Sequence, residues 1–451
     1  MRSLHFDAAL LPEGWARNVR VGVEEGVIVE VESYATPTPT QAGIALPGLA
    51  SLHSHTFQRG MAGLGETRGP TSDSFWSWRQ VMYRFLGALT PEDVEAIAAY
   101  AFMEMLETGF TAVGEFHYLH HGIGGVPYAN IAEHAERIAA AAEETGIGLT
   151  LLPVFYAQGG FGAALPTEGQ RRFINDPEAY ARLFEGSKRA IAPLADANIG
   201  IAPHSLRAVT PESLAALLKA HPTGPIHIHI AEQMREVEDC IAWSGRRPVE
   251  WLYDHVAVDQ RWCLIHATHM TEAEGRAVAR SGAVAGLCPI TEANLGDGIF
   301  DAPTMLTAGG RFGVGTDSNV EITAPGELKL LEYSQRLALR ARNIFPEKEG
   351  QSTGLALYRG ALSGGAQALD REIGRIEKGF RADIVVLDAD HPDLVAVNGD
   401  RWLDSYLFVA GARAVQSVYV GGIERVNAGR HLAREAITRR YTKALTRLAA
   451  L

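Results

Sequence analysis

The chain has 451 residues, enough for one large α/β domain and a smaller one, with 47% hydrophobic and 21% charged residues as in ordinary globular proteins. Its net charge of −12 argues against general nucleic-acid binding, although a locally basic pocket can still hold an anionic substrate. The three cysteines show no CxxC spacing, and no stretch is typical of a signal peptide or a membrane span. We therefore expect a cytoplasmic protein with neither nucleic-acid nor membrane partners.

Both ends of the chain contain segments of β-strand character. In RNVRVGVEEGVIVEVESY, valines alternate on either side of a Glu-Glu-Gly turn, which predicts a hairpin. The late stretches RADIVVLDADHP and AVQSVYVGGIERVNAG have the same character. We therefore predict one small β-sandwich domain formed from residues 1–46 and 371–451. The chain closes on an amphipathic basic helix, which we expect to pack on the body or on a partner subunit.

Residues 47–370 alternate between strand-like and helix-like segments. The strand candidates, in chain order, are GLASLH, FTAVGEF, IGLTLLPVF, IGIAP, IHIHI, WCLIHA, AVAGLC and RFGVGTD. Helix signals lie between them: Thr90 and Pro91 mark one helix start and Gly109 its end, and Thr210 and Thr271 are further N-caps. Eight β-then-α units predict a (β/α)8 TIM-type barrel, and the lack of a glycine-rich phosphate loop argues against a dinucleotide-binding fold.

The longest irregular stretch, GLGETRGPTSDSFWSWRQVMYRF, directly follows the first predicted barrel strand. Active sites of barrel enzymes lie at the carboxyl ends of the strands, so a loop of this length is expected to be functional. The alternatives are a packing loop or a segment, around residues 60–85, that crosses to another subunit. Trp76 and Trp78 are expected to pack within the loop rather than to stack on a ligand.

Four of the predicted strand ends carry histidine or carboxylate side chains. His53 and His55 are two residues apart, so in an extended segment both rings point to the same side. His229 ends the fifth strand, His266 the sixth and Asp317 the eighth. A barrel brings these ends to one cavity. We predict a metal centre with these ligands: His53, His55, His229 and Asp317.

The donor set favours a single divalent metal. The fourth strand segment, NIGIAPHSL, carries no lysine that could be carbamylated to bridge a second metal. We expect Zn²⁺, with Fe²⁺ and Mn²⁺ compatible with the same donors. The histidines of HYLHH, at positions 117, 120 and 121, do not repeat the spacing of the first pair and are expected to lie in a loop or to support the site.

The remaining polar groups predict hydrolytic deamination at an sp² carbon. A divalent metal lowers the pKa of a bound water toward neutrality. We expect Asp317 to take a proton from this water, His266 to stabilise charge on the tetrahedral intermediate, and Glu232 to carry a proton to a nitrogen leaving group.

These motifs resemble those of the amidohydrolase superfamily. The resemblance lies in His-X-His after the first strand, HIAE after the fifth, a histidine after the sixth, GTD after the eighth and the closing IEKGFRADIVVLD. Glu232, three residues after His229, implies the branch of mononuclear deaminases. Within it, SLHSHTFQRGMAGLGETRG, DSFWSWRQVMYRF, GEFHYLHH and CPITEANLGDGIF resemble the formimidoylglutamate deiminase family. The resemblance implies a homodimer that converts N-formimidoyl-L-glutamate and water to N-formyl-L-glutamate and ammonia in histidine breakdown.

The two carboxylates of such a substrate call for arginine forks and for hydroxyl or amide donors. Arg79 lies in the long first loop, and Arg207 follows PHSL in the fourth. Gln58, Tyr118 and His204 also follow barrel strands and are further candidates for binding the substrate. Each of these side chains has a purely structural alternative, such as a surface ion pair.

Two other interpretations of the sequence stay open. One keeps the chemistry but makes the substrate an aminated heterocycle of the guanine, adenosine or pterin type, for which aromatic stacking matters more than paired arginines. The other is a barrel that has lost catalysis and serves as a binding or assembly module. All the expected catalytic positions are filled, which argues against this last interpretation.

Overall fold

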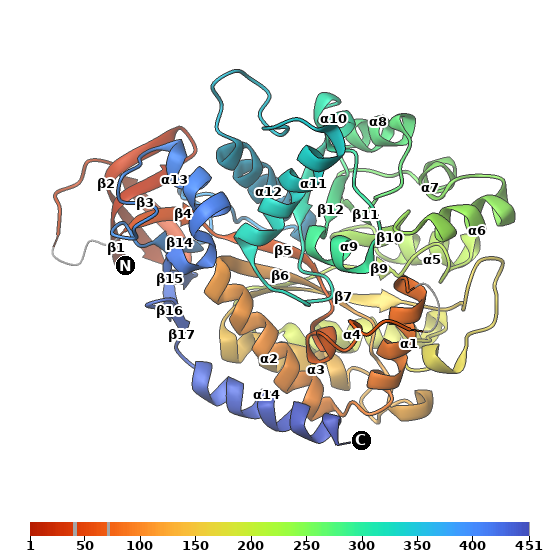
Figure 1. The fold of residues 1–451 in the computed structure, drawn as a ribbon. Coiled ribbons are helices and arrows are strands. Elements are labelled where there is room, and N and C mark those ends of the chain that lie inside the picture. Colours follow the sequence, from red (N-terminus) through yellow and green to blue (C-terminus); the bar gives the residue numbers. More distant parts are fainter. Residues whose placement is uncertain (39–42, 70–72, 451) are drawn as a thin grey trace.

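Strands from the two ends of the chain pair in one sheet. The structure is a computed structural model that describes residues 1–38, 43–69 and 73–450. The strands of this sheet are β1 (Arg2–Leu11), β2 (Gly14–Glu24), β3 (Val27–Glu32), β4 (Ile44–Pro47), β14 (Ile384–Leu387), β15 (Val415–Val420), β16 (Ile423–Asn427) and β17 (Arg430–His431). Their order across the sheet is β17-β16-β15-β14-β4-β1-β2-β3. Figure 1 shows the red N-terminal and blue C-terminal strands side by side at one end of the molecule.

The predicted hairpin is the β2–β3 pair. Glu25 and Gly26 form its turn with φ of 48° and 84°, which is the left-handed geometry that tight hairpins require. Val21 and Val23 are buried on one face, as the alternation predicts. Strands from both chain ends therefore share one sheet. The finer prediction, a two-layer sandwich, stays a prediction.

The barrel strands fall at the predicted segments. They are β5 (Leu49–Ser54), β6 (Phe110–His117), β7 (Gly148–Phe155), β8 (Ala197–Ile199), β9 (Ala202–Pro203), β10 (Ile226–Ile230), β11 (Trp262–His266), β12 (Val284–Leu287) and β13 (Arg311–Val314). The fourth segment is split into β8 and β9, both of which pair with β7.

Parallel pairing runs around the barrel from strand to strand. Continuous ladders join β5 to β8 and β10 to β13. Parallel bridges complete the ring: Ile201 with Ile226 and Ser205 with His229 on one side, and Ser54 with Asp317 on the other. The architecture is therefore an α/β fold of parallel strands consistent with a TIM-type barrel.

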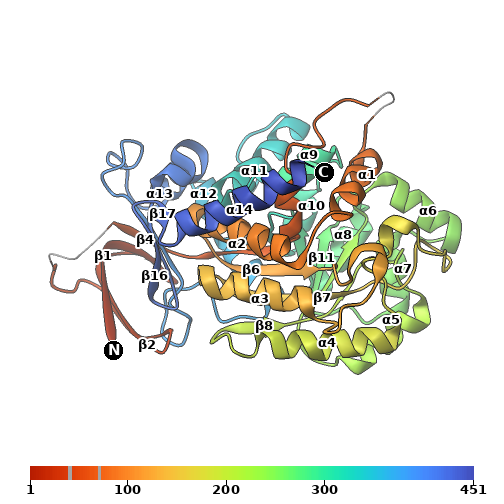
Figure 2. The ribbon, with the colours of Figure 1, turned by 90° about the horizontal axis from the view of Figure 1, so that it is seen from below.

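Helices surround the strands (Figure 2). They are α1 (Phe75–Leu86), α2 (Pro91–Thr108), α3 (Glu133–Thr145), α4 (Pro177–Ile191), α5 (Pro211–Ala220), α6 (Met234–Ser244), α7 (Pro248–His255), α8 (Glu272–Ser281), α9 (Pro289–Leu295), α10 (Ala302–Thr307), α11 (Ala324–Leu339), α12 (Thr353–Leu369), α13 (Asp400–Ser405) and α14 (Arg434–Ala449). Among the described residues, no helix is both long and apolar enough to cross a membrane.

The predicted helix caps are confirmed. Thr90, Thr210 and Thr271 each accept a hydrogen bond from the third helical residue, and Gly109 ends α2 with φ of 106°. The three cysteines are unpaired and buried.

The expectation that the whole stretch after the first barrel strand is irregular was wrong. Its second half forms α1, which begins at a capping box: the Ser74 hydroxyl accepts from the Trp76 N–H, and the Ser77 hydroxyl accepts from the Ser74 N–H. The short 3-10 helix η1 (Thr56–Met61) fills the space between β5 and this loop. Residues 70–72 of the stretch lie outside the described part of the chain.

The bottom of the barrel is closed by the end of α12. The Ala368 carbonyl accepts a hydrogen bond from the buried His227 ring (2.7 Å), and the Leu369 carbonyl accepts one from the Thr150 hydroxyl (3.0 Å). Gly364 allows this helix to approach β13, because a Cβ at that position would lie 1.8 Å from the Phe312 carbonyl oxygen. The opposite end of the barrel, where the strands reach their carboxyl ends, holds the candidate site.

Candidate active site

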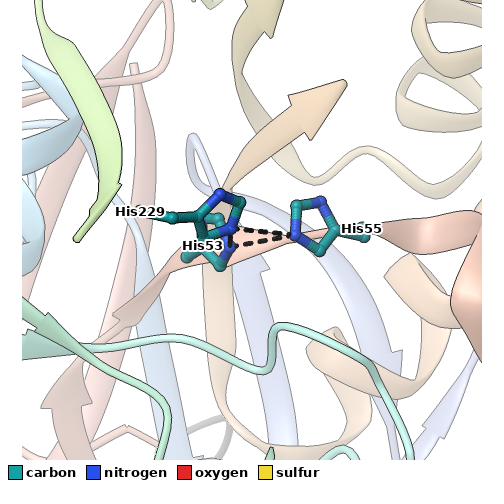
Figure 3. Close-up of side chains that lie close together, drawn as sticks. All are labelled: His53, His55 and His229. Carbon is teal, nitrogen blue, oxygen red and sulfur yellow. Dashed lines mark hydrogen bonds between the residues drawn. The ribbon is translucent and has the colours of Figure 1, made fainter. Parts of the chain in front are cut away.

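Three imidazoles meet at the carboxyl ends of two barrel strands. His53 lies within β5, His55 directly after it, and His229 within β10. The Nε2 atoms are separated by 3.2 Å (His53 to His55), 3.3 Å (His55 to His229) and 3.1 Å (His229 to His53). Figure 3 shows these nitrogens turned toward one point.

The tautomers of two of these rings are set by main-chain carbonyls. The Nδ1–H of His55 donates to the Phe116 carbonyl (2.9 Å), and that of His229 donates to the His204 carbonyl (3.0 Å). Burial lowers the pKa of all three rings, to about 3 for His53, so the rings are neutral. The Nε2 atoms of His55 and His229 therefore carry lone pairs that face each other in a dry environment.

Such an arrangement fits a cation. Facing lone pairs repel unless a positive charge lies between them, and a tetrahedral zinc with bonds of about 2.0–2.1 Å would separate its ligand atoms by roughly 3.3 Å. The three observed separations match this spacing. These three histidines form one group that could hold a metal ion.

Asp317 adds a carboxylate to these three histidines, and the four residues are called the metal group below. The Asp317 Oδ1 lies 3.3 Å from the His55 Nε2 and 3.5 Å from the His53 Nε2. Main-chain hydrogen bonds between the first and last barrel strands position Asp317. The Asp317 N–H donates to the His53 carbonyl (3.0 Å), and the His55 N–H donates to the Asp317 carbonyl (2.9 Å). Burial tends to raise the pKa of Asp317, but the His53 hydrogen bond and the charge of the nearby His266 hold it well below its ordinary value.

His266 stands between the metal group and two further carboxylates. Its Nε2 lies 3.7 Å from Glu232 Oε1 and 3.8 Å from Asp317 Oδ2, and its Nδ1 lies 3.3 Å from Glu292 Oε1. Burial would lower the pKa of His266, but these carboxylates outweigh it and raise the pKa to about 10. Burial raises the pKa of Glu232 to about 7. A cationic donor and a carboxyl group that exchanges protons near neutral pH therefore lie side by side.

Two carboxylates that the sequence analysis missed orient these groups. Glu236 accepts from the N–H groups of Ala231 (3.3 Å) and Glu232 (3.1 Å), and Glu292 accepts from the Cys288 N–H (2.9 Å) as well as from His266. Both lie on helices that follow barrel strands. The only sequence signal for Glu236 is its place four residues after Glu232, a spacing too common on helices to be informative, and Glu292 has no such signal.

A cavity of about 60 Å³ lies above the metal group. All five predicted substrate-binding residues line it: Gln58, Arg79, Tyr118, His204 and Arg207. The Gln58 amide donates to the Tyr118 hydroxyl (2.8 Å), and its own oxygen is buried without a partner among the described residues. A larger cavity of about 910 Å³ lies elsewhere, near Leu10 and Arg375, and contains none of the candidate site residues.

Arg79 and Arg207 bring positive charge to the small cavity. Neither has an ion pair with any carboxylate in the described part of the chain, and the Nε of each is buried without a hydrogen-bond partner. The positions of α1 that line the cavity are 75, 78, 79, 82 and 83, which form one face of a helix. Arg79 is therefore presented from the face of α1 that covers the metal group.

The other histidines of HYLHH hold main-chain groups instead. The His120 ring donates to the Val154 carbonyl (2.9 Å), and the His121 ring donates to the Ile174 carbonyl (2.9 Å). His117 packs against His120 at a centroid distance of 5.3 Å. Trp78 lines the cavity, whereas Trp76 does not and lies against guanidinium groups.

Comparison with known proteins places this barrel and metal group in a family. Residues 44–424 match the amidohydrolase family, and the chain belongs to that family. Residues 1–42 match the N-terminal domain of the formimidoylglutamate deiminase HutF. Within the amidohydrolases, the chain groups with the formimidoylglutamate deiminases: it is 52% identical to that enzyme of Pseudomonas aeruginosa, over 99% of this chain and 100% of the relative.

Other similarities agree with this placement. A crystal structure of an amidohydrolase from Brucella melitensis is 53% identical, covers 100% of both chains and superposes with a TM-score of 0.95. An 8-oxoguanine deaminase of Pseudomonas aeruginosa is 28% identical over 90% of this chain and 89% of its own. A zinc-bound adenosine deaminase from Xanthomonas campestris, 21% identical over 100% of this chain and 98% of its own with a TM-score of 0.83, shares the fold.

Proposed function

We propose that this chain hydrolyses N-formimidoyl-L-glutamate to N-formyl-L-glutamate and ammonia. As a member of its family, the protein is a hydrolase that acts on C–N bonds. The observation that carries the proposal is the pair of unpaired guanidiniums, Arg79 and Arg207, which open into the same cavity as Glu232 and the metal group. A dicarboxylate with a linear amidine supplies an anionic partner to each arginine and an sp² carbon to the acid–base groups.

In the proposed reaction, a water oxygen bonds to the formimidoyl carbon, and the bond from that carbon to the terminal nitrogen breaks. The divalent metal held by His53, His55, His229 and Asp317 supplies Lewis acidity that makes water nucleophilic near neutral pH. The Asp317 carboxylate takes a proton from the attacking water. The terminal nitrogen gains two protons, both from the water: the one taken by Asp317 and the one released from the hydroxyl of the tetrahedral intermediate as its C=O bond forms. Glu232 carries these protons to the nitrogen, which leaves as ammonia, and the His266 imidazolium donates a hydrogen bond to the oxygen as negative charge develops on it.

The substrate groups are assigned to the remaining cavity residues. Arg79 and Arg207 bind the two carboxylates, and Gln58, Tyr118 and His204 orient the chain between them. The unsatisfied Gln58 oxygen supports this assignment, because a buried amide acceptor without a partner is costly until a donor arrives. The N–H groups of an amidine are such donors.

The proposal also covers the metal, the location, the oligomeric state and the domains of the enzyme. We propose Zn²⁺ as the metal, since imidazole nitrogen and carboxylate suit it, and a cytoplasmic homodimer acting in histidine breakdown. Residues 47–370 are proposed as the catalytic barrel domain, flanked by residues 1–46 and 371–451 as the β-sandwich. Light scattering on the purified protein tests the dimer, and metal analysis tests the zinc.

A second candidate, an aminated heterocycle, is favoured by the aromatic side chains in the cavity wall. These are Phe75, Trp78, Tyr83, Tyr118, Tyr156 and Phe173. The two unpaired arginines weigh against this candidate, because an uncharged heterocycle would leave both guanidiniums without an anionic partner. Assays with N-formimidoyl-L-glutamate, 8-oxoguanine and 5′-methylthioadenosine separate the two candidates, and turnover of the heterocycles alone would overturn the first.

The catalytic assignment is tested by Glu232→Gln. This change keeps the shape of the side chain but removes its exchangeable carboxyl proton, so we expect ammonia release to fall at least about 10³-fold. The bound metal should stay at the wild-type amount, because Glu232 is not among its proposed ligands. A variant with near wild-type turnover would contradict the assigned role.

A further inference from the structure

The indole of Trp76 lies among three guanidinium groups. The Cζ atoms of Arg79, Arg235 and Arg207 lie 4.5 Å, 4.7 Å and 5.8 Å from its ring centroid. These arginines come from three segments: α1, the start of α6, and the turn after β9. Trp76 does not line the cavity, whereas Arg79 and Arg207 do. Its ring therefore lies next to two arginines of the cavity wall without being part of that wall itself.

The cavity has two opposing requirements: the charges of its arginines must be stabilised, and their N–H groups must stay free for the substrate. Like charges held close together repel, and burial makes the repulsion stronger. A neighbouring carboxylate would neutralise the arginines, but it would also occupy their N–H groups and compete with an anionic substrate. In the described part of the chain no carboxylate forms an ion pair with Arg79 or Arg207. Burial would lower the pKa of Arg207, but the charges of Glu236 and Glu232 raise it without occupying its N–H groups.

An aromatic face resolves the conflict. Its quadrupole attracts a cation that lies over the ring, and it needs none of the five N–H donors of the guanidinium. The half-buried Trp76 thus stabilises positive charge at the cavity while leaving the in-plane donors free. Arg235, which is 63% exposed, covers the outer side of the cluster and pairs with Asp239 at 3.7 Å.

We propose that Trp76 is a positioning residue that orients Arg79 and Arg207 toward the substrate carboxylates and thereby sets the preference for dicarboxylates. The inference rests on the proposed function, which it deepens by naming a residue that acts on substrate choice without touching the substrate. Its effect should appear in binding of the anionic groups rather than in the chemical step.

Two measurements test the proposal. The first is binding of glutarate, a plain dicarboxylate probe, by titration calorimetry, which needs no turnover. The second is the ratio of kcat/KM for N-formimidoyl-L-glutamate to that for N-formimidoyl-L-glutamine, whose side chain lacks the second carboxylate. Trp76→Leu should weaken glutarate binding about tenfold and lower the ratio by a similar factor, with kcat changed less than about threefold.

Matched variants separate positioning from packing. Trp76→Phe keeps an aromatic face and should retain most of the wild-type binding. Trp243→Leu removes a half-buried indole of α6 that does not line the cavity and contacts no guanidinium among the described residues, so the ratio should stay at the wild-type value. Melting temperatures check that each variant is folded.

The contrary outcomes are distinct. Unchanged glutarate binding in Trp76→Leu would overturn the inference, and so would an equal loss on both substrates or an equal fall in Trp243→Leu. Wild-type protein that binds glutarate but releases no ammonia from N-formimidoyl-L-glutamate would instead overturn the proposed function, while the glutarate comparison would still decide the role of Trp76.

Discussion

Glu115, at the end of β6, links the metal group to the body of the barrel. Its Oε1 accepts hydrogen bonds from the N–H (2.9 Å) and the hydroxyl (2.7 Å) of Thr56, the residue that follows His55. Its Oε2 is buried without a partner among the described residues. Burial raises the pKa of Glu115 to about 7. A carboxyl group that supports the position of His55 therefore ionises near neutral pH.

This shift predicts a pH-dependent stability. Because the pKa of Glu115 is higher in the folded protein than in the unfolded chain, the stability it contributes is full below about pH 4.5 and is lost as the pH rises through about 7. Glu115→Gln keeps an oxygen acceptor and cannot ionise. We expect it to melt above wild type at pH 8, by the equivalent of at most about 3 kcal/mol, and to lose most of this advantage at pH 5. Thermal unfolding at the two pH values checks this, and an equal difference at both would contradict it.

Individual site residues differ in how far the sequence could predict them. The geometry places His53, His55, His229 and Asp317 together because each ends or follows a barrel strand, so strand order alone brings them to one cavity. Glu292 and Trp76 act through other side chains, and their contacts depend on how helices pack. No local pattern marks such residues, which is why the sequence analysis left the first unassigned and expected the second only to pack the loop.

At the scale of elements, α14 attaches the C-terminus to the barrel. It runs alongside α2 in both ribbon views (Figures 1 and 2). Tyr441 stacks on Tyr100 of α2 with a centroid distance of 3.9 Å and an interplanar angle of 7°. Arg434 and Arg447 form ion pairs with Glu107 and Asp93, at the two ends of α2. The basic face predicted from the sequence therefore contacts acidic groups of the same chain.

The stacked tyrosines should stabilise this contact. Tyr441→Ala removes one ring of the pair and the apolar surface it buries, so we expect a loss of about 1–3 kcal/mol in the free energy of unfolding. Urea denaturation measures it. Lys443→Ala, at an exposed position of the same helix, is the control and should stay within about 0.5 kcal/mol of wild type. Equal stability of both variants would show that the stack contributes nothing.

The helix α1 shows where element prediction from sequence fails. Its cap at Ser74 and its cavity-facing positions have helical spacing, but the preceding glycine, proline and serine residues are typical of a loop. The turn residues before α1 therefore made the whole stretch look irregular. One face of this helix lines the cavity above the metal group. The α2 helix, with threonine cap, proline start and glycine end, was predictable because all its signals are local.

At the scale of the whole molecule, the ring of strands assembles the metal group. The bridge between Ser54 and Asp317 joins the first and last barrel strands, so the carboxylate reaches the histidines only when the ring is complete. A metal bound there contacts side chains from both halves of the barrel. It should therefore stabilise the folded chain as a whole.

Metal removal tests this coupling. Protein treated with a chelator should melt at a lower temperature than protein with free zinc held at a hundred times Kd, by an amount equivalent to about 2.7 kcal/mol. His229→Ala lacks one of the three imidazoles and should respond weakly to zinc. A melting temperature that does not depend on metal in the wild-type protein would contradict the proposed centre.

The central claim is that a metal group and two unpaired arginines act together on a dicarboxylate amidine. The most direct test is a steady-state measurement of ammonia released from N-formimidoyl-L-glutamate, made on protein whose bound metal has been counted. We predict turnover in proportion to metal content, approaching full activity at one divalent ion per chain and lost on chelation. Full activity in metal-free protein, or no ammonia release from this substrate by metal-loaded protein, would contradict the account.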